Sequence, residues 1–205
     1  RYKPMLRLKY YESIVVYVDP SWKSGGKDDY KARKMWGLPK RGLKTASHRE
    51  LHCIRAFCRQ CGVGEMVRWL YDLYESLPED CAATFYMEAN FMQDTILDEF
   101  QREGDIRGYQ LPVMPDTRKK PDKFARIEAI SPLWERGLVW YNIRLKDDAD
   151  MRTSIDQTLS FEQGSRAHDD SPDADEGAIY KLQKQVRQDT MPPRIGMRQA
   201  PKEGW

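Results

Sequence analysis

The chain has 205 residues and a formal net charge of +2, with 40% hydrophobic and 32% charged residues. This composition is typical of a single globular domain with its own core, and it excludes a mainly disordered chain. No apolar run approaches the roughly 20 residues that a membrane helix needs, so no membrane partner is expected. Because the net charge is close to neutral, binding to nucleic acid would depend on local basic patches.

The first strand that the sequence predicts carries a carboxylate at its end. Residues 13–19 form a short β-branched run that ends at Asp19, and the proline that follows stops the strand. A polar, glycine-containing loop over 21–29 leads to predicted strands over 31–38 and 50–59. These first three strands are expected to form an antiparallel meander.

Helices alternate with strands in the rest of the chain. The last helix is predicted to begin with Ser171 as its cap and Pro172 at its first position. Strands interleaved with helices predict an α/β fold with a mixed sheet flanked by helices. In chain order, the pattern predicts a helix over 66–77, a strand over 83–88, a helix from 90 that stops at Gly104, a strand over 109–114, a helix over 122–130, a hairpin over 133–141 and a helix over 151–161.

Acidic residues stand at the ends of predicted elements. Asp19 before a proline is also common in turns, but Glu88 ends a strand that should be central, where an unpaired carboxylate is costly. Helix-start chemistry explains Asp173 well, but it explains Asp169 and Asp170 poorly because they precede the predicted cap. Together these acids match what hard divalent cations require, which is several carboxylate oxygens that converge on Mg²⁺ or Mn²⁺.

A rival metal site could form around the histidines and cysteines in the middle of the chain. This cluster lacks paired C-x-x-C spacing, and one of its cysteines falls in an apolar strand-like run, so buried thiols are the favoured interpretation over zinc. Its members are His48, His52, Cys53, Cys58 and Cys61.

Four motifs give the chain a more specific resemblance. They are, in order, VYVDPSWKSGGKDDYKA, FYMEAN, KFARIEAISPLWERGLVWY and HDDSPDA. The ordered set resembles the C-terminal nuclease domain of tailed-phage large terminase subunits. The resemblance implies a ribonuclease-H-like fold and a metal-dependent endonuclease that cuts concatemeric double-stranded viral DNA during genome packaging.

The resemblance also implies roles for particular residues. Asp19 would bridge two Mg²⁺ or Mn²⁺ ions, and Glu88 would lie on the neighbouring strand. Asp170 and Asp173 both remain candidates for the helix-start ligand, because the chain carries Asp175 where relatives usually have an apolar residue. The residues expected beside these ligands are His168 and Asp169.

The resemblance further implies an organisation and a set of partners. Residues 1–12 would lead in from an upstream ATPase domain, 13–190 would form the nuclease domain and 191–205 a flexible tail. No G-x-x-x-x-G-K-[ST] loop is present in this chain. The expected partners are double-stranded DNA, the portal protein and the small terminase subunit, and the expected location is the host cytoplasm.

Two basic clusters could hold DNA, although such runs are more often solvated surface. Alternative functions are a non-catalytic module that grips DNA and docks on the portal, another ribonuclease-H-like nuclease of the resolvase or integrase type, and a zinc-bound interaction domain. The candidate DNA-binding residues are Lys119, Lys120, Lys123 and Arg126 in one cluster and Lys40 and Arg41 in the other.

Overall fold

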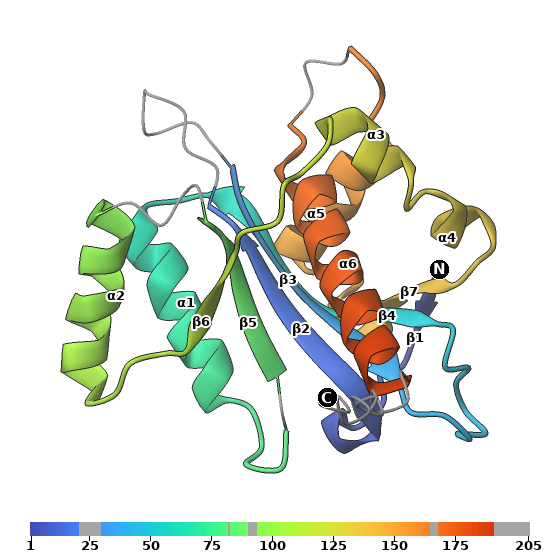
Figure 1. The fold of residues 1–205 in the computed structure, drawn as a ribbon, viewed down its shortest axis with the longest axis horizontal. Coiled ribbons are helices and arrows are strands. Elements are labelled where there is room, and N and C mark those ends of the chain that lie inside the picture. Colours follow the sequence, from blue (N-terminus) through green and yellow to red (C-terminus); the bar gives the residue numbers. More distant parts are fainter. Residues whose placement is uncertain (21–29, 82, 90–93, 165–167, 191–205) are drawn as a thin grey trace, which may run out of the picture.

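The computed structural model describes residues 1–20, 30–81, 83–89, 94–164 and 168–190. The predicted loop over 21–29 and the predicted tail over 191–205 therefore lie outside the described residues. A seven-stranded sheet with the order β1-β7-β4-β3-β2-β5-β6 forms the centre of the structure (Figure 1). Its strands are β1 (Tyr2–Lys3), β2 (Tyr11–Asp19), β3 (Tyr30–Pro39), β4 (Leu51–Gln60), β5 (Ala83–Glu88), β6 (Val113–Asp116) and β7 (Val139–Asn142).

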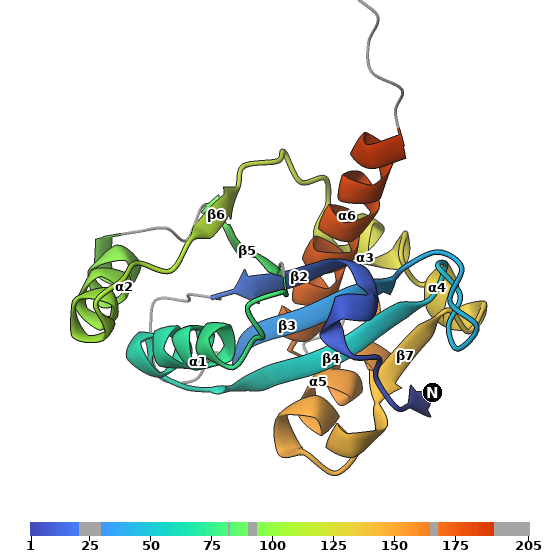
Figure 2. The same ribbon diagram turned by 90° about the horizontal axis from the view of Figure 1, so that it is seen from below.

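The sheet is mixed, as the sequence predicts. β2, β3 and β4 pair antiparallel, which confirms the predicted meander, whereas β5 runs parallel to β2 and β6 runs parallel to β5. On the other side, β7 pairs parallel with β4 and β1 pairs parallel with β7. Figure 2 shows the N-terminus beside β7, so part of segment 1–12 belongs to this sheet.

Helices cover both faces of the sheet. The described helices are α1 (Val63–Glu75), α2 (Asp94–Arg107), α3 (Lys123–Glu128), α4 (Pro132–Glu135), α5 (Ala149–Leu159) and α6 (Asp170–Thr190), with short 3₁₀ turns at Leu8–Tyr10 and Ile143–Leu145. Within the described ranges, none of them combines the length and the apolar character that crossing a bilayer requires.

Alternation along β2 separates two apolar cores. Val16 and Val18 point to the face that α1 and α2 cover, and Val15 and Tyr17 point to the face that α5 and α6 cover. Because both faces are buried, the strand reads as a continuous apolar run rather than an alternating one. Asp19 has the same parity as Tyr17, so it belongs to the α6 side.

The predicted hairpin over 133–141 is wrong. Pro132 at the first turn begins the short helix α4, and Gly137 follows it with a φ of 67°. Leu133 and its neighbours are therefore helical, and β7 finds its partners in β4 and β1 instead.

Two predicted helix boundaries also differ from the structure. α2 continues through Gly104 to Arg107 and is followed by Gly108 at a φ of 79°. A Cβ at Gly104 would lie 2.2 Å from the Gln110 side chain, so this glycine permits close packing rather than ending the helix. Ser171 does not cap α6, because the helix begins at Asp170 and the Ser171 hydroxyl donates to the Ser154 carbonyl at 2.8 Å.

Candidate active site

Three acids stand at the carboxyl ends of neighbouring parallel strands. Asp19 ends β2, Glu88 ends β5 and Asp116 ends β6. The register pairs Val18 with Met87 and Glu88 with Asp116, so the three strand ends are level with one another. Carboxyl ends of parallel strands are a common place for functional side chains, because they meet along one edge of the sheet.

Helix α6 brings further acids to this edge. Asp170 is its first residue, Asp173 follows in the first turn, and both side chains are buried. One turn further on, Gly177 packs against the ring of Tyr17 in β2. Because the glycine has no side chain there, the helix lies close to the strand, and its first turn lies beside Asp19.

The electrostatics of Asp19 show how near these acids lie to it. Burial raises the pKa of Asp19 well above its ordinary value, and the charges of Asp173 and Asp170 raise it further. Glu88 contributes in the same direction. The structure therefore brings Asp19, Glu88, Asp170 and Asp173 close to one another, although they come from three distant segments of the sequence.

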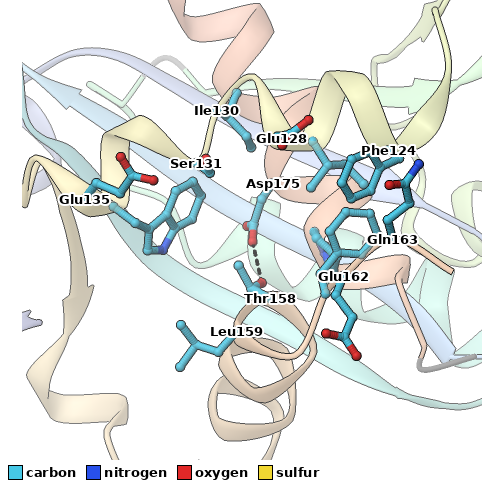
Figure 3. A pocket seen from close by; sticks show the side chains of 14 residues that line it. Phe124, Glu128, Ile130, Ser131, Glu135, Thr158, Leu159, Glu162, Gln163 and Asp175 are labelled. Atoms are coloured by element: carbon cyan, nitrogen blue, oxygen red, sulfur yellow. Dashed lines mark hydrogen bonds between the residues drawn. The ribbon is translucent and has the colours of Figure 1, made fainter. Parts of the chain in front are cut away.

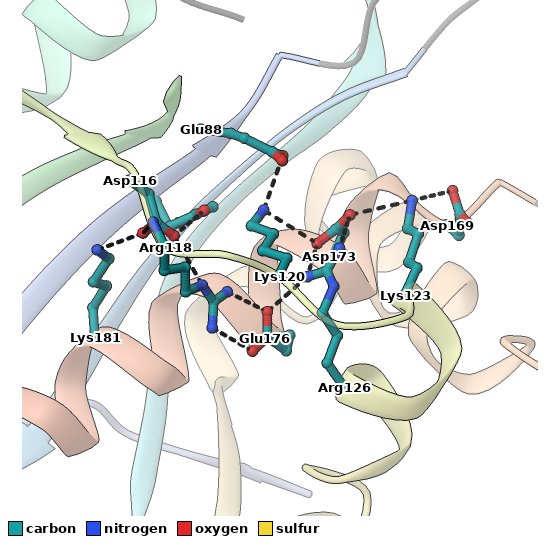
Figure 4. Close-up of polar contacts among 11 residues, drawn as sticks. Glu88, Asp116, Arg118, Lys120, Lys123, Arg126, Asp169, Asp173, Glu176 and Lys181 are labelled. Carbon is teal, nitrogen blue, oxygen red and sulfur yellow. Dashed lines mark hydrogen bonds and ion pairs between the residues drawn. The ribbon is translucent and has the colours of Figure 1, made fainter. Parts of the chain in front are cut away.

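Basic side chains from the segment before α3 and from α3 itself neutralise this acidic cluster (Figure 4). Lys120 Nζ lies 2.9 Å from Glu88 Oε2 and 3.9 Å from Asp173 Oδ1. Lys123 Nζ lies 2.8 Å from Asp169 Oδ1 and 3.3 Å from Asp173 Oδ2. These two lysines were predicted to bind DNA, with solvated surface charge as the alternative, and in this structure they pair with the acids.

Arg126 fixes the carboxylate of Asp173 through both of its terminal nitrogens. Its Nη2 donates to Asp173 Oδ2 at 2.7 Å, and its Nη1 lies 2.5 Å from Asp173 Oδ1 and 2.7 Å from Glu176 Oε2. Burial alone would raise the pKa of Asp173, but the hydrogen bond from Arg126 and the charges of Lys123 and Lys120 lower it below its ordinary value. Asp173 is therefore held ionised.

The acids have the chemistry of a cation site, but they are not arranged as a ready one. No group of three or more His, Cys, Asp or Glu side chains is positioned to hold a metal ion in the part of the chain that the structure describes. Asp173 Oδ1 is buried and accepts no well-formed hydrogen bond among the described residues, although Arg126 Nη1 lies 2.5 Å and Lys120 Nζ 3.9 Å from it. A buried carboxylate oxygen that accepts no well-formed hydrogen bond fits a hard divalent cation.

Sequence reasoning missed a chain of ion pairs next to this cluster. Asp116 accepts from the Tyr17 hydroxyl at 2.8 Å and pairs with Lys181 at 2.7 Å and Arg118 at 3.1 Å. Arg118 in turn binds Glu176 through two nitrogens. The strand preceding Asp116 was predicted to end at Met114, since Pro115 follows. An acid two residues after the predicted end of a strand is the signal that could have identified Asp116.

Asp175 has a different role from its acidic neighbours. It points away from Asp19 and accepts from Trp36 Nε1 at 3.0 Å and from the Thr158 hydroxyl at 2.9 Å. Lys34 Nζ lies 2.9 Å from its Oδ1, and both side chains of this pair are completely buried. Asp175, at the position where terminase nuclease domains usually have an apolar residue, is thus neutralised by Lys34, and its contacts with Lys34 and Trp36 hold α6 against β3.

His168 and Asp169 lie at the margin of the cluster. The His168 ring packs on Tyr30 with 4.6 Å between centroids, and its Nδ1 lies 4.0 Å from Asp170 Oδ2. Asp169 reaches the cluster through Lys123. His168 is thus next to one candidate ligand, and Asp169 is linked to the candidate ligand Asp173 through Lys123.

The predicted DNA-binding residues do not form one surface. Lys119 is exposed beside the acidic cluster. Lys40 and Arg41 follow β3, whose last residue, Pro39, pairs with Tyr11 at the start of β2. They therefore lie at the opposite end of the sheet from Asp19.

The rival cysteine and histidine cluster is divided between the core and the surface. Cys53 and Cys58 are buried in β4, and burial raises the pKa of each thiol to about 12. His52 lies within 3.0 Å of both the Tyr11 hydroxyl and Glu50. Buried protonated thiols are poor zinc ligands, since metal binding requires thiolates.

Cavities lie on both sides of α3 and the segment before it. One of about 300 Å³ adjoins the acidic cluster and is lined by Glu88, Asp116 and the basic run from Arg118 to Lys120. A larger one of about 420 Å³ lies between α3, α4 and the ends of α5 and α6 (Figure 3). Its walls are mostly apolar. Asp175, which points away from Asp19, lines this cavity and accepts a hydrogen bond from the Thr158 hydroxyl there.

No protein-family model matches the sequence, and no curated protein sequence matches it either. Among solved structures, the human cytomegalovirus terminase nuclease domain is similar at a TM-score of 0.58 and 14% identity, covering 83% of each chain. The P22 large terminase nuclease domain is similar at a TM-score of 0.57 and 10% identity, covering 89% of this chain and 86% of that one. The chain therefore has the ribonuclease-H-like fold of terminase nuclease domains, as its sequence motifs predict.

Proposed function

We propose that this chain is the nuclease domain of a DNA-packaging terminase and that it hydrolyses phosphodiester bonds of double-stranded viral DNA with divalent metal. The observation that carries this proposal is the convergence of Asp19, Glu88, Asp170 and Asp173 at one edge of a terminase-nuclease fold. Acids from three separate segments gather there although their mutual repulsion is unfavourable. Such an arrangement is costly for stability and therefore favours a functional explanation.

Different residues of the chain would bind the metal, orient a ligand and contact the DNA in such a site. Asp19, Glu88 and either Asp170 or Asp173 would hold two Mg²⁺ or Mn²⁺ ions, and rigid strand ends and a helix start keep these carboxylates in place. Bound ions of this kind activate a water molecule and stabilise the leaving oxygen in phosphodiester hydrolysis. Arg126 orients Asp173, and the exposed ammonium of Lys119 is available for a DNA phosphate.

A plasmid-nicking assay tests the proposal. The protein should nick supercoiled DNA with Mn²⁺ or Mg²⁺, and chelator should abolish the reaction. Asp19→Asn and Glu88→Gln should each lose cleavage while keeping the wild-type circular dichroism spectrum. Asp147→Asn is the matched control, because Asp147 is exposed and lies outside the cluster. Equal cleavage by Asp19→Asn and the wild type would refute the proposal.

A second candidate is a non-catalytic module that grips DNA. The specific observation that favours it is the pairing of the acids with Lys120, Lys123 and Arg126 in place of a ready metal group within the described residues. This candidate predicts salt-sensitive DNA binding, no cleavage with any metal, and no effect of Asp19→Asn on binding. The nicking assay separates the two.

The packaging context gives the proposed partners. The upstream ATPase domain, the portal protein and the small terminase subunit would act with this domain in the host cytoplasm. Co-purification of a longer chain with the portal would test this assignment.

A further inference from the structure

The side chain of Lys120 occupies the space between the two nearest candidate ligands. Its ammonium lies 2.9 Å from Glu88 Oε2 and 3.9 Å from Asp173 Oδ1, and the lysine is 11% exposed. The ammonium is buried, yet it donates no well-aligned hydrogen bond within the described part of the chain. Figure 4 shows it between the two carboxylates. A buried ammonium without a hydrogen bond is costly, so this position is held by charge alone.

Oδ1 of Asp173 lies on the same side as the Lys120 ammonium, 3.9 Å from it. Asp173 is 5% exposed, and its Oδ1 is an acceptor without a hydrogen-bond donor among the described residues. The Lys120 ammonium and this oxygen lie 3.9 Å apart, too far for a hydrogen bond, and each has another charged neighbour, Glu88 Oε2 at 2.9 Å from the ammonium and Arg126 Nη1 at 2.5 Å from the oxygen. A divalent cation bound to Asp173 Oδ1 and Glu88 would satisfy both acids better than the ammonium does, and it would repel Lys120.

The cavity beside the acidic cluster can accommodate the Lys120 side chain once a cation displaces it. This cavity of about 300 Å³ is lined by Lys120 itself, by Arg118 and Lys119, and by the acids Glu88 and Asp116. Asp116 is already paired with Arg118 and Lys181. Lysine has a flexible four-carbon stem, so its ammonium can move from the acids into this cavity without movement of the backbone. The exposed Lys119 and a displaced Lys120 along this wall match the charge of a DNA phosphate, since Arg118 is already paired with Asp116 and Glu176.

We infer that Lys120 exchanges between the Glu88–Asp173 carboxylates and a DNA phosphate in the adjoining cavity, so that binding of divalent metal and binding of DNA strengthen each other. This inference rests on the proposed function and adds to it a substrate-binding residue whose availability depends on the metal. The coupling is reciprocal by thermodynamic necessity, because the metal frees the ammonium that the phosphate uses.

Metal affinity measured without any cleavage tests the first half of the inference. Free Mn²⁺ is quantified by electron paramagnetic resonance in titrations of the wild-type protein, Lys120→Met and Lys120→Gln. Both variants should bind Mn²⁺ about tenfold more tightly than the wild type, since the competing cation is gone. The control is Lys184→Met, which removes an exposed lysine of α6 and should leave Mn²⁺ affinity unchanged.

DNA affinity tests the second half. Binding of a short labelled duplex is measured by fluorescence anisotropy with and without Ca²⁺. Ca²⁺ should strengthen wild-type binding about tenfold, and both Lys120 variants should lose this gain. Lys119→Met should weaken binding with and without Ca²⁺ alike, because that ammonium is exposed in either state.

The outcomes separate this inference from the proposed function. If the wild type binds Mn²⁺ and the Lys120 variants bind it no more tightly, the exchange is overturned and the nuclease proposal stands. If neither the wild type nor the variants bind Mn²⁺, both are overturned. If only the variants bind it, the exchange is supported in its strongest form.

Discussion

The ammonium of Lys34 lies 2.9 Å from the Asp175 carboxylate, and neither side chain has any exposure to solvent. Although burial alone would lower the pKa of Lys34, the charge of Asp175 raises it above its ordinary value, so the pair is ionic. This buried pair joins β3 to α6 two residues after Asp173. Its geometry therefore affects the placement of the candidate ligands as well as stability.

A double-mutant cycle on this pair should be strongly non-additive. Lys34→Met or Asp175→Asn alone leaves one buried charge without its partner and should cost about 3 kcal/mol or more of the free energy of unfolding. The double variant leaves no charge, while Asn can still accept from Trp36 through its oxygen and donate to the Thr158 hydroxyl through its amide nitrogen. It should be no less stable than either single variant in urea unfolding. Additive losses would show that the pair has no such coupling.

Gly177→Ala should destabilise the protein. A Cβ at this position would lie 2.4 Å from the ring of Tyr17, which is fully buried and cannot move aside easily. Overpacking of this kind costs about 1–3 kcal/mol, which exceeds the gain in helix propensity of up to about 1 kcal/mol. Thermal unfolding measures the net loss, and cleavage should fall as well because α6 is pushed away from Asp19.

Gly64→Ala in α1 is the matched control for that substitution. A Cβ there would meet the end of the flexible Glu99 side chain at 3.0 Å rather than a packed ring. We expect a neutral or slightly stabilising effect. Equal losses from the two substitutions would show that close packing at Gly177 is not the cause.

Arg126→Lys should not be a conservative substitution. Arg126 contacts both oxygens of Asp173 and also Glu176, whereas a lysine presents a single ammonium. Loss of one buried charged hydrogen bond should lower the free energy of unfolding by about 2 kcal/mol. Asp173 should also become mobile, and metal-dependent nicking should decrease. Arg144→Lys at an exposed position is the control and should change neither property.

Asp116 should contribute to unfolding in acid. Although burial opposes it, hydrogen bonds from Lys181 and Tyr17 and the charges of Lys181 and Arg118 lower the pKa of Asp116 below its ordinary value of 3.8. A carboxyl whose pKa is lower in the folded state binds fewer protons there than in the unfolded chain. Its contribution to stability is therefore complete above pH 3.8 and is lost as the pH falls through the folded-state pKa.

Asp116→Asn tests this contribution. The variant should be less stable than the wild type at neutral pH, and the difference should shrink as the pH falls below 3.8. Urea unfolding at a series of pH values measures it. A constant difference across the series would mean that the Asp116 charge does not matter.

Local pattern was sufficient to predict the strands that carry Asp19 and Glu88. Each acid ends a run of apolar and β-branched residues, and this signal does not depend on the rest of the fold. The convergence of these acids with Asp170 and Asp173 was expected from the order of the motifs. The antiparallel arrangement of β2, β3 and β4 was expected because these three strands follow one another with no predicted helix between them.

Ion pairs between residues far apart in the sequence could not be predicted from local pattern. Lys34 lies in a charged stretch of β3 that favours a solvent-exposed face, and its burial depends on Asp175, which lies far along the chain. Lys120 and Lys123 were interpreted as surface charge for the same reason. The wrong hairpin over 133–141 arose because Arg136-Gly137 was interpreted as its turn, whereas here these residues follow the end of the short helix α4.

The antiparallel register of β2 and β3 sets a length scale for any DNA that reaches both basic regions. Asp19 and Tyr11 are eight residues apart on β2, and Lys40 follows the residue paired with Tyr11. At about 3.3 Å per residue, this separation is roughly 26 Å, or about eight base-pair steps of 3.4 Å. A duplex that contacts the protein near both ends of this strand would span most of one helical turn. Lys40 and the acids would then meet phosphates about eight base-pair steps apart.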